Sequence, residues 1–257
     1  MFFQCQGRSG IGLLRTKNQD NLYVNGQILA TDTDSEVVSL SDTATQGIYA
    51  ICDGMGGEHF GEEASLLGVR GLDKLTPAKF ADGIYDYLIS VNAEICDLMR
   101  IRSNLRIGTT FVALCITGDS GCMVNIGDSR CYHFHCGQFV QLSHDHTQVQ
   151  RLINMGLISK NDAAEHPDCH KLTQHLGIFP EEMIIEPYVC ESIQIQSGDI
   201  FLLCSDGLTE MVCEDDINMI LHTQISLKDK VDKLYELAIQ HGGKDNTTII
   251  LVEAIND

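Results

Sequence analysis

Four aspartates lie at the ends of apolar, strand-like runs, where a folded sheet can bring together residues that are far apart in the sequence. Asp53 ends the run IYAICD, and Asp206 follows IFLLCS. Asp245 precedes TTIIL, and Asp128 follows CMVNIG. Carboxylates that meet at one sheet edge repel one another unless cations lie between them. Because hard divalent ions prefer oxygen ligands, this repetition predicts a site for two or three such ions.

The segment around Asp53 is the sharpest of these signals. Three glycines occur within the four residues after Asp53, and glycines let the backbone turn sharply and expose its carbonyl oxygens. The carbonyl of Gly54 is therefore a further candidate ligand. On its own, an Asp-Gly pair is more typical of a tight turn, so the recurrence of the pattern is what favours metal binding.

The stretch RTKNQD, residues 15–20, adds a cation to these acids. Arg15 carries a planar guanidinium that matches phosphate oxygens and stays charged at all relevant pH values. Asp20 comes directly before an expected strand at 21–24. An isolated arginine of this kind usually forms only a surface ion pair, which is the simpler alternative for Arg15.

Short runs of branched and aromatic residues, bounded by Gly, Asp or Asn, predict the strands that carry these sites. Helices that come in pairs between groups of strands indicate an α+β fold, with stacked antiparallel sheets and helices outside. A polar loop or wide hairpin is expected at 31–46. The expected strands are 48–52, 109–116, 122–126, 131–136, 138–142, 200–204 and 247–252, and the expected helices are 61–75, 80–98, 215–223 and 227–240.

The charge balance restricts the partners. The chain has 17 Lys and Arg against 36 Asp and Glu, a formal net charge of −19, which disfavours nucleic acid and anionic membrane surfaces. No run approaches the roughly 20 apolar residues that span a bilayer, and residues 1–14 do not resemble a signal sequence. We therefore expect one domain, residues 1–257, in the cytoplasm, with its eleven cysteines reduced.

In this order, the motifs resemble those of the PPM family of metal-dependent protein serine/threonine phosphatases, the type 2C phosphatases. The likeness extends from about residue 10 to residue 252 and matches a minimal, bacterial-type catalytic domain. It implies a four-layer α/β/β/α sandwich of two mainly antiparallel sheets flanked by helices. It rests on RTKNQD at 15–20, DGMGG at 53–57, GEEAS at 61–65, GTT at 108–110, NIGDSR at 125–130, DH at 145–146, SDGL at 205–208 and KDN at 244–246.

The resemblance also implies which residues bind metal. Asp53 is expected to bridge two Mn²⁺ or Mg²⁺ ions, with Asp206 and Asp245 completing one site and the Gly54 carbonyl serving the other. Asp128 would help to bind a third, looser ion. A water shared between the two ions is the implied nucleophile, since two cations lower its pKa and hold it for attack on phosphorus.

The resemblance gives Arg15 the role of holding the phosphate oxygens, and Asp20 that of acting through metal-bound water. Two positions depart from the family pattern. Met55 stands where many relatives have a histidine thought to protonate the leaving alcohol, and a thioether cannot donate a proton. Solvent or metal-bound water is then the expected acid, with His59 a weaker candidate. Glu210 stands where relatives often have aspartate, which predicts weaker or altered third-site binding.

A group of histidines follows residue 143, but its spacings fit no zinc template, so we expect surface and core residues. In the family, a mobile flap follows the DH motif, and residues at about 147–178 would occupy its place. The group comprises His144, His146, His166, Cys169, His170 and His175.

The favoured function is Mn²⁺- or Mg²⁺-dependent hydrolysis of phosphoserine and phosphothreonine in proteins, by a monomer that opposes a Ser/Thr kinase. One alternative is a catalytically silent pseudophosphatase scaffold, although such proteins usually lack metal-site acids that are present here. The other is a two-metal phosphodiesterase or nuclease, which the acidic charge disfavours.

Overall fold

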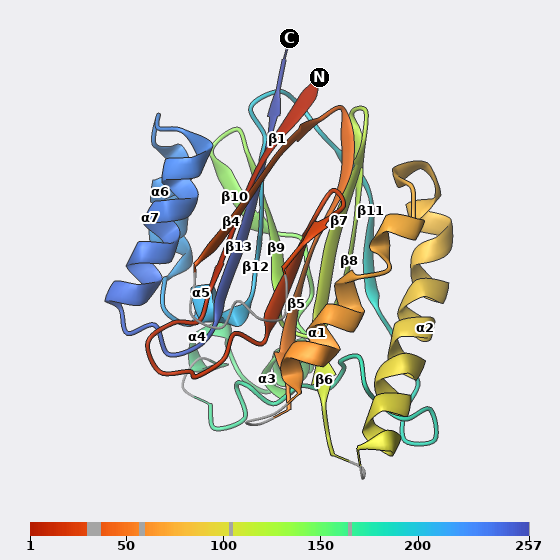
Figure 1. Ribbon diagram of the computed structural model, residues 1–257. Helices are drawn as coiled ribbons and strands as arrows, with labels where there is room; N and C mark the ends of the chain where they lie inside the picture. The colour runs from red at the N-terminus through yellow and green to blue at the C-terminus, as the bar shows by residue number, and fades with distance from the viewer. Residues whose placement is uncertain (30–36, 57–59, 103–104, 164–165, 257) are drawn as a thin grey trace.

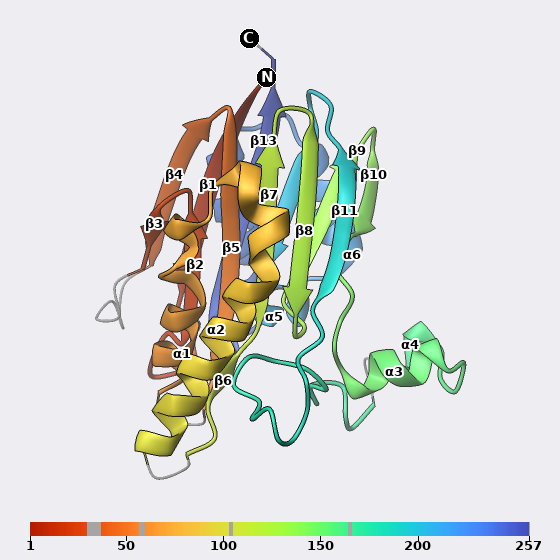
Figure 2. The same ribbon diagram turned by 90° about the vertical axis from the view of Figure 1, so that its right-hand side faces the viewer.

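Two antiparallel sheets pack face to face, and helices cover both outer faces (Figures 1 and 2). The computed structural model describes residues 1–29, 37–56, 60–102, 105–163 and 166–256. The expected four-layer α/β/β/α sandwich is therefore confirmed. Both chain termini lie at the end of the sandwich opposite α3 and α4 (Figure 1).

The first sheet has six strands in the order β10-β9-β12-β13-β1-β4. The second sheet has the order β11-β8-β7-β5-β2-β3, with β6 paired to β5. The strands are β1 Phe2–Gly10, β2 Asp20–Val24, β3 Gln27–Ile28, β4 Val38–Ala44, β5 Gln46–Met55, β6 Gly108–Thr109, β7 Phe111–Thr117, β8 Ser120–Ile126, β9 Arg130–His135, β10 Gln138–Gln141, β11 Tyr188–Gln194, β12 Ile200–Cys204 and β13 Thr247–Ile255.

The helices belong to two pairs and a group near one end of the sheets. The pair α1 (Gly61–Val69) and α2 (Phe80–Ile101) covers the second sheet, and the pair α6 (Glu214–His222) and α7 (Leu227–Gln240) covers the first. The group near one end comprises α3 Gln148–Asn154, α4 Lys160–Ala163 and α5 Asp206–Thr209, and two 3₁₀ turns, Leu72–Lys74 and Pro77–Lys79, connect α1 to α2.

Alternation along the central strands divides the apolar residues among three layers. In β5, Ala50 and Cys52 pack under α1 and α2, whereas Tyr49 and Ile51 lie between the sheets. In β12 the same alternation sends Leu202 toward α6 and α7. Because both faces of these strands are buried, they appear in the sequence as continuous apolar runs, and those runs were the ones predicted.

Several boundaries differ from prediction. The helix expected at 61–75 ends at Val69 and continues as a 3₁₀ turn. The region expected to be a loop or hairpin, 31–46, instead contributes β4, an edge strand paired with β1 rather than with its sequence neighbour; residues 31–36 lie outside the described part. Val38 and Leu40 alternate with polar residues and pack on the core between the sheets, so the strand is half-buried and polar on average.

The strand order brings the candidate aspartates to one end of the sandwich. In the antiparallel pair β12–β13, Cys204 lies opposite Ile249, so the segment after β12 meets the segment before β13. Arg130, the first residue of β9, also lies opposite Cys204. None of the described helices is long and apolar enough to cross a bilayer.

Candidate active site at the ends of the sheets

A pocket of about 530 Å³ lies where the strands that carry the aspartates end. Asp20 is only 4% exposed and lies beside the pocket, paired with Asp53 across two strands. The structure therefore brings all seven sequence-predicted site residues together. The six that line the pocket are Arg15, Asp53, Gly54, Asp128, Asp206 and Asp245.

Asp20 and Asp53 are direct partners in the antiparallel pair β2–β5, which places their Cα atoms roughly 5 Å apart. Asp20 Oδ2 accepts hydrogen bonds from the hydroxyls of Ser205 (2.8 Å) and Thr248 (2.6 Å). Asp20 Oδ1 is buried and has no hydrogen-bond partner among the described residues. A buried carboxylate oxygen without a partner is costly, so this atom fits contact with a water or a cation.

Gly54 follows Asp53 in the tightest backbone contact of the site. Its N–H donates to the carbonyl of Gln19 at 3.1 Å. A Cβ at this position would lie 2.2 Å from the carbonyl oxygen of Gly61 and 2.4 Å from that of Gln19. Only glycine fits here. The glycine after Asp53 is therefore required by close backbone packing and not by a tight turn alone.

Asp206 and Asp245 come from the two neighbouring strands of the first sheet. Asp206 begins α5 directly after β12, and its Oδ1 is the second buried carboxylate oxygen of the site without a partner in the described chain. Asp245 Oδ1 accepts the backbone N–H of Asn246 at 2.7 Å, and its Oδ2 accepts a hydrogen bond from the guanidinium of Arg15.

Burial and mutual repulsion dominate the electrostatics of the cluster. Desolvation, reinforced by the neighbouring carboxylates, raises the pKa of Asp53 and Asp206 well above the usual range. Burial also raises the pKa of Asp20 to about 7, although its two hydroxyl donors oppose the shift. For Asp128, burial and then the charge of Asp145 raise the pKa to about 6. The charged forms of these acids are thus disfavoured unless positive charge is supplied.

Arg15 supplies some of that charge. Its hydrogen bond to Asp245 raises its own pKa, and the charges of Asp53 and Asp206 add to the effect. Within the described chain it is the only Lys or Arg ion-paired with any of Asp20, Asp53, Asp206 and Asp245. Its side chain is 51% exposed at the pocket, so the guanidinium can also reach a ligand there.

Asn246 fixes the segment that carries Arg15. It is 4% exposed, and its side-chain nitrogen donates to the carbonyls of Ile11 (3.0 Å) and Lys17 (2.9 Å). Its side-chain oxygen accepts the N–H of Gln19 at 2.8 Å. This positioning role was not predicted, although Asn246 belongs to the KDN motif, because it depends on contacts across more than 220 residues.

Thr110 holds Asp53 in a similar way. The Asp53 N–H donates to Thr110 Oγ1, and the Thr110 N–H donates to the Asp53 carbonyl, each at 2.9 Å. Thr110 Oγ1 also bonds Ser129 Oγ at 2.6 Å. Residues of the GTT and GDSR motifs therefore hold Asp53 in position. The sequence analysis identified both motifs but did not predict this positioning role for Thr110 and Ser129.

The segment 147–178 reaches the pocket from the side. It projects outward through α3 and α4 (Figure 2) and returns along the site, where His170, Leu172 and His175 line the pocket. His170 is a surface residue, as expected, with a side chain that is 65% exposed, and its Nδ1 pairs with Glu210 at 2.7 Å. His170, Asp206 and Glu210 also offer ligand atoms within 4.8 Å of one another. His59 lies outside the described residues.

The donor set fits divalent cations. Carboxylate and carbonyl oxygens are the ligands that Mg²⁺ and Mn²⁺ prefer. Two buried oxygens without partners and several acids with raised pKa values indicate a site that lacks sufficient positive charge from its own side chains. Asp53, Asp206, Asp245 and the Gly54 carbonyl could hold such ions, and Asp128 could contribute to a further one.

Known proteins resemble this chain in sequence and in fold. The profile of the family described as Stage II sporulation protein E (SpoIIE) matches residues 91–254. The serine/threonine phosphatase stp of Listeria monocytogenes is 35% identical over 217 residues, covering 81% of this chain and 84% of that protein.

Solved structures extend the likeness to the whole chain. The serine/threonine phosphatase PstP/Ppp of Mycobacterium tuberculosis matches with a TM-score of 0.83 and 28% identity, over 100% of both chains. The catalytic domain of PstP in complex with two manganese ions matches with a TM-score of 0.80 and 27% identity, again over 100% of both. The chain therefore belongs to the PPM family of serine/threonine protein phosphatases.

Proposed function

We propose that this chain hydrolyses phosphoserine and phosphothreonine in proteins, with two Mn²⁺ or Mg²⁺ ions held by Asp53, Asp206, Asp245 and the carbonyl of Gly54. The proposal rests mainly on one observation. Buried carboxylates meet at one pocket, and two of their oxygen atoms have no hydrogen-bond partner among the described residues. A relative with two manganese ions and the same fold supports the number of ions.

When bound, the ions would supply the activated water that attacks phosphorus and would offset the charge of the phosphate. Arg15 provides the phosphate clamp. Its guanidinium lies at the pocket on a segment fixed by Asn246, and its paired N–H groups suit two phosphate oxygens. Asp20 is held through Oδ2, which leaves Oδ1 to accept a hydrogen bond from water.

Met55 lines the pocket beside these residues and has no proton to donate. Protonation of the leaving alcohol is therefore assigned to solvent. Glu210 is already paired with the imidazole of His170, from segment 147–178. This pairing competes with binding of a metal ion by Glu210. We therefore propose that a third ion, bound through Asp128 and Asp206, binds more weakly than the other two.

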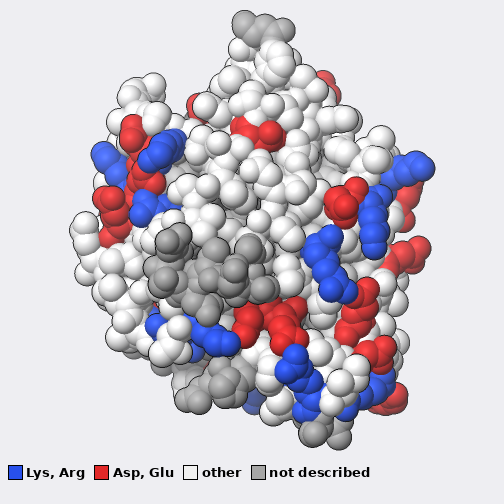
Figure 3. Space-filling model, in the orientation of Figure 1, with Lys and Arg blue, Asp and Glu red and all other residues white. Residues whose placement is uncertain are grey.

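The substrates we propose are proteins phosphorylated by a Ser/Thr kinase. Figure 3 shows lysines and arginines interspersed with acidic residues on the face seen in Figure 1, rather than gathered into one basic area. Together with the net charge of −19, this disfavours nucleic acid and anionic lipid as partners. A single domain with segment 147–178 as a flap, a monomeric state and a cytoplasmic location remain predictions from the sequence.

The stability of the metal-free protein should depend on the protonation of Asp20. An ordinary aspartate has a pKa near 3.9 when unfolded, whereas burial raises that of Asp20 to about 7. The proton is thus bound more tightly in the folded chain, so the stability it contributes is complete below about pH 4 and is lost as pH rises through about 7. We expect the free energy of unfolding without metal to fall across this window in urea titrations.

Asp20→Asn should make that fall shallower, because the titrating carboxyl is gone. Asp86→Asn, at an exposed position of α2, should follow the wild type. A wild-type stability that rises steadily from pH 4 to pH 7 would contradict the electrostatic account.

Turnover should depend on bound metal and on the charge of Asp245. Asp245→Asn removes a carboxylate charge while keeping the side-chain shape, and it should lower turnover of a phosphothreonine peptide with Mn²⁺ by more than about 100-fold. Even outer partners of a metal site cost 10- to 100-fold when removed. A chelator should abolish turnover by the wild type.

The substrate in the same assay separates the alternatives. Turnover of p-nitrophenyl phosphate but not of bis-p-nitrophenyl phosphate is expected of a phosphomonoesterase. Comparable turnover of the diester would indicate the phosphodiesterase, and a folded wild type with no turnover in Mn²⁺ would indicate the scaffold.

Arg15 should contribute to binding of the substrate phosphate. Arg15→Ala should lower kcat/KM for the phosphopeptide by about 100-fold, the usual cost of losing one donor to a charged transition state. Arg70→Ala is the matched control, since Arg70 is similarly exposed and pairs with Glu94 outside the pocket. Equal kcat/KM for Arg15→Ala and Arg70→Ala would remove Arg15 from substrate binding.

A further inference from the structure

A second group of possible ligands lies at the far end of the first sheet. His133 and His135 are two residues apart on β9, so their side chains share one face. That face points between the two sheets. Cys131, which lies on the same face of β9, and Phe201, the cross-strand partner of His133, both belong to the core between the sheets. Asp199 directly precedes the neighbouring strand β12.

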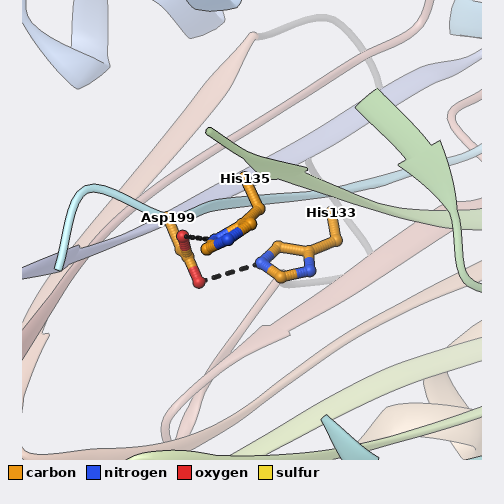
Figure 4. A group of neighbouring side chains, drawn as sticks. All are labelled: His133, His135 and Asp199. Carbon is orange, nitrogen blue, oxygen red and sulfur yellow. Dashed lines mark hydrogen bonds and ion pairs between the residues drawn. The ribbon is translucent and has the colours of Figure 1, made fainter. Parts of the chain in front are cut away.

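The three side chains converge on one point. His135 Nδ1 lies 2.6 Å from Asp199 Oδ1, and His133 Nε2 lies 3.0 Å from Oδ2. Figure 4 shows both imidazoles turned toward the carboxylate. The ring of His133 stacks on Phe201 with centroids 4.4 Å apart and planes within 6°. The ligand atoms of the group lie within 4.8 Å of one another, so small side-chain movements would bring all three onto one ion.

The carboxylate of Asp199 needs a counter-charge. Its side chain is 3% exposed, and within the described chain its ion-pair partners are only these two histidines. The N–H of Gln196 adds a hydrogen bond at 2.9 Å. Two imidazoles and a backbone N–H satisfy the lone pairs of this buried carboxylate, but an imidazole balances its charge only when it is protonated. A divalent cation would balance the charge with both imidazoles neutral.

We propose that His133 Nε2, His135 Nδ1 and the Asp199 carboxylate bind a divalent transition-metal ion, with Zn²⁺ the best chemical match. Two imidazole nitrogens and one carboxylate suit Zn²⁺, whereas Mg²⁺ and Ca²⁺ prefer oxygen alone. On binding, each neutral imidazole carries its proton on the nitrogen that faces away from Asp199, and a metal–nitrogen bond replaces each hydrogen bond. Solvent completes the coordination beside His135, whose side chain is 35% exposed.

The proposed site is separate from the catalytic pocket and does not depend on the proposed function. His135 lies five residues along β9 from Arg130, roughly 17 Å at about 3.3 Å per residue, and Arg130 is the end of β9 nearest the pocket. The ion would tie β9 to the turn before β12, next to the edge strand β10. Its expected effect is therefore on stability rather than on turnover.

The test compares Zn²⁺ binding by the wild type with binding by His135→Asn, in excess Mg²⁺. His222→Asn is the matched control, because His222 packs against Phe134, the residue between the two ligands on β9. Equilibrium dialysis should show one Zn²⁺ fewer per chain for His135→Asn than for the wild type and His222→Asn. Zn²⁺ at about 100 times its Kd should raise the Tm of the wild type and of His222→Asn by roughly 5 °C more than it raises the Tm of His135→Asn.

Equal Zn²⁺ stoichiometry and equal Tm shifts in the wild type and a folded His135→Asn would overturn the proposal. Imidazole NMR of the wild type tests it without any substitution. Zn²⁺ should shift the resonances of His133 and His135 and leave those of His222 unchanged, and unshifted resonances of His133 and His135 would also overturn it.

Discussion

Several buried carboxylates lie together at one end of the sandwich, where the packing of the two sheets must overcome their mutual repulsion. The β2–β5 register places Asp20 directly opposite Asp53, and the β12–β13 register brings Asp206 and Asp245 alongside. The apolar layers fix those registers, because a slip of one residue would turn every buried side chain to the wrong face. Packing therefore holds together charges that would otherwise separate.

The polar contacts around the cluster position the acids without neutralising them. Ser205 and Thr248 hold one oxygen of Asp20, and Thr110 holds the backbone of Asp53. Asn246 fixes the arginine-bearing segment by three hydrogen bonds. These groups are neutral donors and acceptors, so the excess negative charge remains at the pocket. Such an arrangement costs stability and is what strong binding of cations requires.

The sequence predicted much of this because buried strands and clustered motifs leave local signals. The strand 200–204 and the helix 227–240 match β12 and α7 in full. Prediction failed where elements are polar on one face, as in β4, or where no motif marks them, as in β1 and β11. The convergence of the aspartates could be predicted because each lies within two residues of the end of an apolar strand.

Residues whose roles depend on distant contacts could not be predicted in the same way. The contact of His170 with Glu210 joins segments 40 residues apart and follows from the path of 147–178 around the pocket. The His-x-His pattern at His133 and His135 was visible on an expected strand, but its third member, Asp199, is 64 residues further on. Only the β9–β12 pairing unites them.

We propose that this carboxylate cluster holds two divalent ions close together. Electron paramagnetic resonance of the wild type titrated with Mn²⁺ tests it most directly, because neighbouring Mn²⁺ ions give a spin-coupled spectrum that isolated ions do not. Two Mn²⁺ should bind per chain and give a coupled signal, and Asp53→Asn should give an uncoupled signal or none. Binding of a single isolated Mn²⁺, or a coupled signal unchanged in Asp53→Asn, would show that the cluster does not hold an ion pair.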